Sequence, residues 1–121
     1  MGAPVVHFEV HLRNDKNMDF YSKLFDWKVD ANNPMKYGLV DTNSGGAGIA
    51  GGISPSQPGQ GPMVTFYVQV KDLGATLKKA EQMGGKTVMP PMDIPGMVSM
   101  AMFADPDGNV IGLVLPEPPP A

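Results

Sequence analysis

Hydrophobic and polar residues alternate strictly along two stretches of the chain, and a helical pattern follows each stretch. Residues 5–12 read Val-Val-His-Phe-Glu-Val-His-Leu, and residues 63–70 read Met-Val-Thr-Phe-Tyr-Val-Gln-Val. This alternation predicts two strands, each with one face against a packed layer and the other against a wetter surface. Apolar residues at helical spacing then predict a helix from the Asn14-Asp15 cap to about Phe25, and another after the Asp72 cap.

Shorter strands complete each half of the chain. In the first half they are expected from Lys28, over Tyr37–Asp41 and over Ile49–Ile53. In the second half they are expected over Lys86–Met89, where Pro90-Pro91 ends the strand, over Gly96–Phe103 and over Asn109–Leu115. The turn Asp105-Pro106-Asp107-Gly108 separates the last two, and Asp and Gly suit such a turn structurally.

The two halves repeat one plan. Phe8 matches Phe66 and Val10 matches Val68, at an offset of 58 residues. An internal repeat is a stronger signal than any single element. We therefore predict one α+β domain over residues 1–121, with module one at about 5–54, a connector at 54–62, module two at about 63–116 and a proline-rich tail at 116–121.

Composition narrows the classes of partner. The net charge is −3 and no run of like charge occurs, so a nucleic-acid partner is not expected. No apolar stretch has the length needed to cross a bilayer, no signal peptide is recognised, and cysteine is absent, so we expect a cytoplasmic protein without a membrane partner. The 10 methionines either adapt an interior to an irregular ligand or fill gaps in an imperfect core.

Several segments together resemble the glyoxalase / bleomycin-resistance / extradiol-dioxygenase (vicinal oxygen chelate) superfamily. They are His7–Leu12, Phe20–Trp27, the Gly84-Gly85 helix stop and Asp105–Asn109. The resemblance implies two βαβββ modules whose sheets curl around a shared cavity, often beside a homodimer interface. It also implies a divalent metal held by four side chains, one from the first and one from the last strand of each module.

Three of those four positions hold poor metal ligands, and only His7 is a good match. The resemblance places the first on His7, the second on Thr65, the third on Ala50 or Gly51, and the fourth on Gly112. Glycine and alanine offer no ligand atom in the side chain, and a neutral threonine is a weak one. We therefore expect no metal cofactor and regard His7 as a remnant of the metal site. A divalent metal held by His7, Glu9 and His11 on one strand is the weaker alternative, because the spacing hardly lets one ion reach all three.

Polar residues of the two first strands are the candidate ligand-binding wall. The full candidate set is His7, Glu9, His11, Thr65, Tyr67, Gln69, Met100, Met102 and Gly112. The wall is interpreted as a small-molecule binding site in the manner of the antibiotic-sequestering members. Two alternatives stay open: a glyoxalase-, isomerase- or dioxygenase-type enzyme with a modified site, in which His7 or Glu9 is catalytic and Glu9 acts as a general base, or an accessory module acting through a dimer interface.

Overall fold

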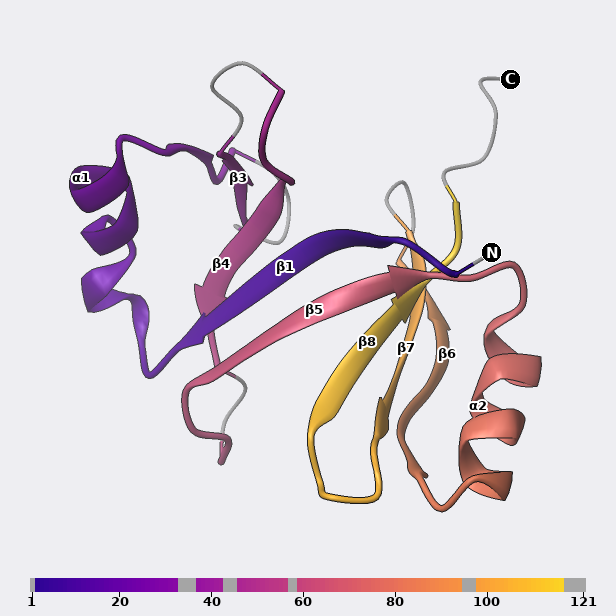
Figure 1. Cartoon of the computed structure of the whole chain (residues 1–121). Helices are drawn as coiled ribbons and strands as arrows, with labels where there is room; N and C mark the ends of the chain where they lie inside the picture. The colour runs from indigo at the N-terminus through magenta and orange to yellow at the C-terminus, as the bar shows by residue number, and fades with distance from the viewer. Residues whose placement is uncertain (1, 33–36, 43–45, 57–58, 95–97, 117–121) are drawn as a thin grey trace. The chain divides into compact units, whose positions relative to one another are not determined.

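The structure, a computed structural model, describes residues 2–32, 37–42, 46–56, 59–94 and 98–116. The chain divides into two compact units (Figure 1). The first unit is Val6–Thr65, and the second is Phe66–Ala121 together with Met1–Val5. Part of the predicted connector and nearly all of the predicted proline-rich tail lie outside the described residues.

The first unit carries a mixed sheet and a short helix. Its elements are β1 (Val5–Leu12), the 3-10 helix η1 (Asp15–Asn17), α1 (Phe20–Phe25), β2 (Lys28–Asp30), β3 (Gly38–Asp41) and β4 (Gly51–Pro55). The strand order is β2-β3-β4-β1. β1 and β4 run parallel, and the other pairs of this unit are antiparallel.

The second unit repeats this arrangement. Its elements are β5 (Met63–Gln69), which begins in the first unit's last residues, α2 (Leu73–Gln82), β6 (Lys86–Asp93), β7 (Ser99–Ala104) and β8 (Val110–Val114). The strand order is β5-β8-β7-β6, with β5 parallel to β8 and the other pairs antiparallel. The α+β class and the βαβββ repeat that the sequence predicts are therefore confirmed.

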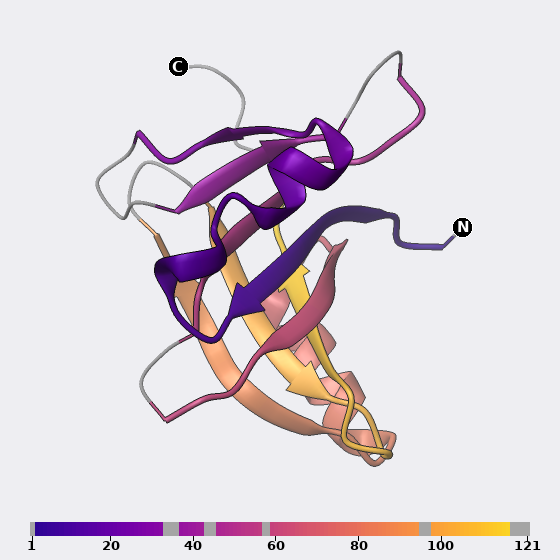
Figure 2. The ribbon, with the colours of Figure 1, turned by 90° about the vertical axis from the view of Figure 1, so that its left-hand side faces the viewer.

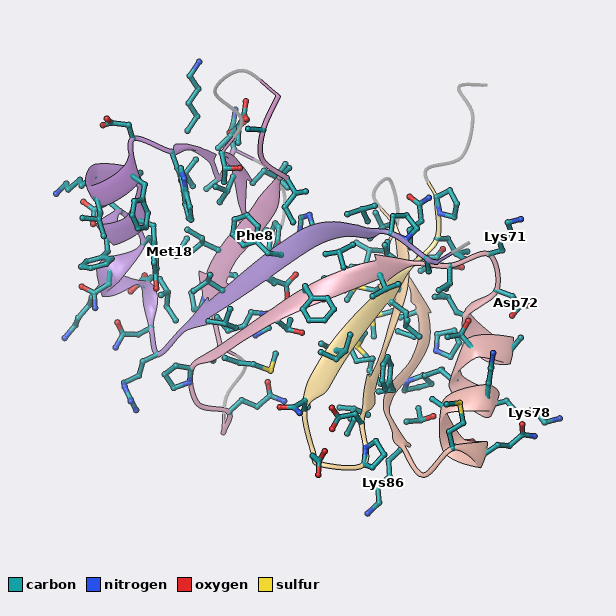
Figure 3. The ribbon with its side chains drawn as sticks, in the orientation of Figure 1. Phe8, Met18, Lys71, Asp72, Lys78 and Lys86 are labelled. Carbon is teal, nitrogen blue, oxygen red and sulfur yellow. The ribbon has the colours of Figure 1, made fainter. Side chains whose placement is uncertain are left out.

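Each unit has a separate apolar core beneath its helix. In the first unit Val10, Val40 and Ile53 are buried, and Phe8, Met18 and Trp27 pack against them. Figure 3 labels Phe8 and Met18. The Phe8 and Trp27 ring centroids lie 5.5 Å apart. In the second unit α2 lies against one face of the sheet (Figure 2), where Leu73 and Leu77 pack with Ala101 and Leu113. On β5 the predicted faces are wrong: Thr65 and Tyr67 of the expected polar face are buried, whereas Val64 and Phe66 of the expected apolar face are 72% and 40% exposed.

Several bounds shift by one or two residues, such as β4, which is expected over Ile49–Ile53 and spans Gly51–Pro55, and two elements differ more clearly from the sequence-based prediction. The expected continuous helix after Asn14 is instead η1 followed by α1, because the Asn14 side chain accepts the Lys16 backbone N–H and favours a tight local turn. The expected strand end at Pro90-Pro91 is also wrong, since β6 continues to Asp93. β6 lies at the sheet edge and its pairing with β7 shifts register twice, which accommodates two residues that have no N–H to donate.

The caps of α2 agree with the prediction. The Asp72 carboxylate accepts the Ala75 backbone N–H, and Gly84 ends the helix with a φ of 98°. The Asp105 carboxylate binds the backbone N–H groups of Asp107 and Asn109 and so closes the last turn, as a structural role requires. Among the described helices, none combines the length and the apolarity that a membrane crossing needs.

Candidate functional site

The polar face of β1 carries a hydrogen-bonded chain of four side chains. Tyr37 Oη donates to Glu9 Oε2 over 2.8 Å and lies 3.1 Å from His7 Nε2. His11 Nε2 contacts the other carboxylate oxygen, Oε1 of Glu9. Glu9 is only 9% exposed, so its carboxylate is held by these partners in a largely dry environment. The structure thus brings the three predicted residues of β1 together, around Glu9.

Tyr37 is the member of this chain that the sequence analysis did not identify. It precedes β3 and is separated from Glu9 by 28 positions in the sequence. Its single hydroxyl hydrogen points at Glu9, so its contact with His7 requires a hydrogen supplied by the imidazole. His7 Nε2 is therefore a donor in this arrangement, and that atom has no lone pair left for a metal ion.

Burial sets the charge of His7. The pKa of His7 lies below its usual value of 6.5, first because burial penalises the imidazolium and despite the Glu9 carboxylate, which raises the pKa. At neutral pH His7 is therefore uncharged, and it is linked to Glu9 through the hydroxyl group of Tyr37.

The lowered pKa of His7 predicts a pH-dependent stability. The unfolded chain takes up the His7 proton at a higher pH than the folded chain does, so acid favours unfolding. We expect the free energy of unfolding to hold steady above the unfolded value of 6.5 and to fall as the pH drops below it. Urea unfolding of the wild type and of His7→Gln from about pH 8 to about pH 5 measures this. An identical pH dependence in the two proteins would contradict the assignment.

A glycine on β4 makes room for Tyr37. Gly52 pairs with Glu9 across the parallel strands. A Cβ atom added at Gly52 would lie 1.5 Å from the Tyr37 hydroxyl oxygen, which no real structure tolerates. The position that a side chain of β4 would fill beside Glu9 is thus occupied by a phenol from outside that strand.

The strand register also corrects the third position of the family's metal site. Glu9 pairs with Gly52 as Tyr67 pairs with Gly112, and Glu9 and Tyr67 correspond in the repeat. The residue of module one that matches Gly112 is therefore Gly52, and not Ala50 or Gly51. Gly51 belongs to the other face of the sheet, where an added Cβ would lie 2.4 Å from the Phe8 ring.

The second unit has the same arrangement at the fourth metal-ligand position, where a tyrosine ring fills the space beside a glycine. A Cβ at Gly112 would lie 2.4 Å from the Tyr67 ring, which is itself only 3% exposed. Met102 pairs with Gly112 from the other side, so Tyr67, Gly112 and Met102 form one row across three strands. Ala101 belongs to the opposite, helix-covered face. Met102, and Met100 two residues before it, therefore lie on the face that carries Tyr67.

The other predicted wall residues also lie on β5. Thr65 is buried, and Gln69 is half-buried and pairs with Val114. The first unit thus gathers His7, Glu9 and His11, and the second gathers Tyr67, Gly112 and Met102. A cavity shared by the two walls stays a prediction.

The residues at the four metal-ligand positions do not fit a metal. Gly52 and Gly112 have no side-chain donor, and tyrosines fill the space beside both. Thr65 offers only a neutral hydroxyl, and Nε2 of His7 is committed to Tyr37. Within the part of the chain that the structure describes, no group of three or more His, Cys, Asp or Glu side chains is arranged to hold a metal ion.

Comparisons with known proteins point to one superfamily. The profile of the Glyoxalase/Bleomycin resistance protein/Dioxygenase superfamily matches residues 13–113. The Anthracycline biosynthesis protein DauV of Streptomyces sp. (strain C5) is 32% identical over 105 residues, which cover 74% of this chain and 38% of that protein. The match therefore spans well under half the length of that relative.

Solved structures agree on the fold. A glyoxalase/bleomycin resistance protein/dioxygenase superfamily member from Vibrio splendidus 12B01 superposes with a TM-score of 0.60 at 14% identity, over 95% of this chain and 100% of that one. The 2,2',3-trihydroxybiphenyl 1,2-dioxygenase of Sphingomonas wittichii strain RW1 gives a TM-score of 0.64 at 18% identity, over 99% of this chain and 43% of that one. With its repeated βαβββ modules and a profile match over most of its length, this chain belongs to the Glyoxalase/Bleomycin resistance protein/Dioxygenase superfamily.

Proposed function

We propose that this protein binds a small organic molecule on the polar face of β1, without the four-ligand metal site of its superfamily. The observation that carries the proposal is the pair of glycines, Gly52 and Gly112, at positions where metal-binding members need side-chain ligands. Tyr37 and Tyr67 fill the space beside these glycines with polar aromatic groups. A phenol and a carboxylate orient a polar ligand without a Lewis acid.

The ligand class that we propose is based on the name of one relative, DauV. DauV is named for anthracycline biosynthesis, and anthracyclines are polycyclic aromatic ketones that carry hydroxyl groups. We propose a hydroxylated polycyclic aromatic ketone as the ligand.

Metal analysis and a binding titration test this function together. Purified protein dialysed against Zn²⁺, Ni²⁺, Mn²⁺ or Fe²⁺ should retain far less than one equivalent of metal. The same protein should bind daunorubicin saturably in a fluorescence titration. Because Glu9 is the charged group at the centre of the network, Glu9→Gln should weaken binding by about tenfold or more, the worth of one charge-assisted hydrogen bond.

The control is Asp107→Asn, which removes a carboxylate from an exposed turn and should leave the affinity unchanged. One tightly bound divalent ion per chain would overturn the metal-free function. Equal affinities in Glu9→Gln and the wild type would remove Glu9 from the binding site.

A second candidate function is metal-independent proton transfer by Glu9. A buried carboxylate held by Tyr37 and His11 is the arrangement of a general base, which would take a proton from a carbon beside a carbonyl group and return it to the neighbouring atom. The assay is turnover of methylglyoxal with glutathione by metal-depleted protein. Activity that is lost in Glu9→Gln, with folding intact, would favour this candidate, and no activity in the wild type would reject it for that substrate.

A further inference from the structure

Every assigned hydrogen in the network on β1 points towards Glu9. His7 Nε2 donates to Tyr37, and Tyr37 donates to Glu9. His11 Nε2 faces the second carboxylate oxygen. Tyr37 links His7 to Glu9, and it comes from a segment outside β1 and β4.

We propose that Tyr37 is a positioning residue that fixes neutral His7 as its Nε2–H tautomer and orients the Glu9 carboxylate, so that the site selects hydrogen-bond-donating ligands over anionic ones. The selectivity part of this inference rests on the proposed binding function, whereas the tautomer part does not. Since a phenol has one hydrogen, its donation to Glu9 leaves only its oxygen lone pairs for His7. Neutral His7 must then carry its hydrogen on Nε2.

The preference for donors follows from charge. A carboxylate that is only 9% exposed repels a second anion more strongly than a carboxylate in bulk water does, because the surroundings screen the pair less. Compounds with hydroxyl or amino groups supply the hydrogens that carboxylates accept. A ligand carboxylate would meet like charge at Glu9, and the neutral His7 would not compensate for it.

Gly52 provides an independent way to disturb Tyr37 without removing its hydroxyl. In Gly52→Ala the added Cβ would lie 1.5 Å from the hydroxyl oxygen and 1.9 Å from the ring carbon that bears it, so the ring must move. Tyr37→Phe removes the hydroxyl and leaves the ring. Both variants should therefore have the same effect on His7, although their chemistry differs.

The chain contains only two histidines, which makes the readout simple. Long-range ¹H–¹⁵N NMR spectra of uniformly labelled protein distinguish Nε2–H from Nδ1–H imidazoles. In the wild type above pH 7 we expect His7 to be the Nε2–H tautomer. In Tyr37→Phe and Gly52→Ala we expect signals of mixed tautomers. Tyr21→Phe, a tyrosine packed on Trp27, and Gly61→Ala, where an added Cβ meets nothing within 4 Å, are the matched controls and should resemble the wild type.

A ligand pair completes the experiment. 2-(Hydroxymethyl)anthraquinone and anthraquinone-2-carboxylate share a ring system and differ in one substituent, and the first should bind at least about tenfold more tightly, an advantage of about 1.4 kcal/mol that Tyr37→Phe should reduce. A His7 hydrogen on Nδ1 in the wild type, or an unchanged His7 spectrum in Tyr37→Phe, overturns the positioning role. Equal affinities for the two compounds overturn the selectivity. Failure of both compounds to bind, with the tautomer as expected, rejects the proposed function for this ligand class and the selectivity with it, but leaves the positioning role of Tyr37 intact.

Discussion

Replacing Ile53 by alanine is expected to lower the free energy of unfolding by about 2–5 kcal/mol, the range for truncating a fully buried aliphatic side chain. Ile53 has an exposed fraction of 0% and lies in the core with Val10 and Val40. It pairs with Val10 on one side and with Gly38 on the other, so the surrounding strands cannot easily collapse into the space left behind. Urea unfolding measures the loss as a shift of the midpoint at a constant slope.

Two variants calibrate this result. Ile53→Val removes one methyl group and should cost about 0.5–1.5 kcal/mol. Ile49→Ala makes the same chemical change as Ile53→Ala at a residue that is 39% exposed, and should cost much less. Equal losses for Ile53→Ala and Ile49→Ala would show that the core of the first unit is not where the structure places it.

Adding one methyl group at Gly112 is the second change with a large expected effect. In Gly112→Ala the new Cβ would lie 2.4 Å from the Tyr67 ring. Tyr67 is buried and cannot move into solvent without exposing its ring, so we expect a loss of about 1–3 kcal/mol from overpacking. Gly61→Ala adds the same methyl group in open space and serves as the control.

A double-mutant cycle tests whether the stability lost in Gly112→Ala comes from contact with the Tyr67 ring. In a Tyr67→Ala background the same Gly112→Ala substitution meets no ring and should cost little. The two changes should therefore be coupled by about 0.5–3 kcal/mol, as is usual for residues in contact. Additive losses in urea unfolding would mean that the Tyr67 ring does not occupy the space beside Gly112, and would remove the structural basis for the lost fourth ligand position.

Local patterns predicted the elements well because they depend on near neighbours in the sequence. The period-two alternation identified β1 and β5 as strands, and Asp72 identified the start of α2. The alternation did not identify the buried face of β5, where Thr65 and Tyr67 are buried and Val64 and Phe66 are exposed. Two predicted boundaries are clearly wrong: one where a side chain forms a local hydrogen bond with the backbone, and one where an edge strand has an irregular register. The Asn14 side chain caps the start of a short 3-10 turn, and the register shifts of β6 accommodate its two prolines.

The site was only partly predictable. The sequence placed His7, Glu9 and His11 on one strand face, and it identified Gly112 as a lost ligand position. It misplaced the third position because the Gly-rich segment before β4 gives no periodic signal, and the register had to come from strand pairing. It missed Tyr37, although a glycine opposite a buried glutamate signals that a side chain from elsewhere fills the gap.

By itself the sequence determined the α+β class, the two repeated modules and the face of β1 that carries the polar residues. These features follow from the spacing of apolar residues and from capping side chains, which act over a few positions. The tertiary structure alone decided that Gly52 lies beside Glu9 and that Tyr37 joins His7 to that carboxylate. The physical reason is that strand register and a contact across 28 positions depend on how distant segments pack, which no local pattern encodes.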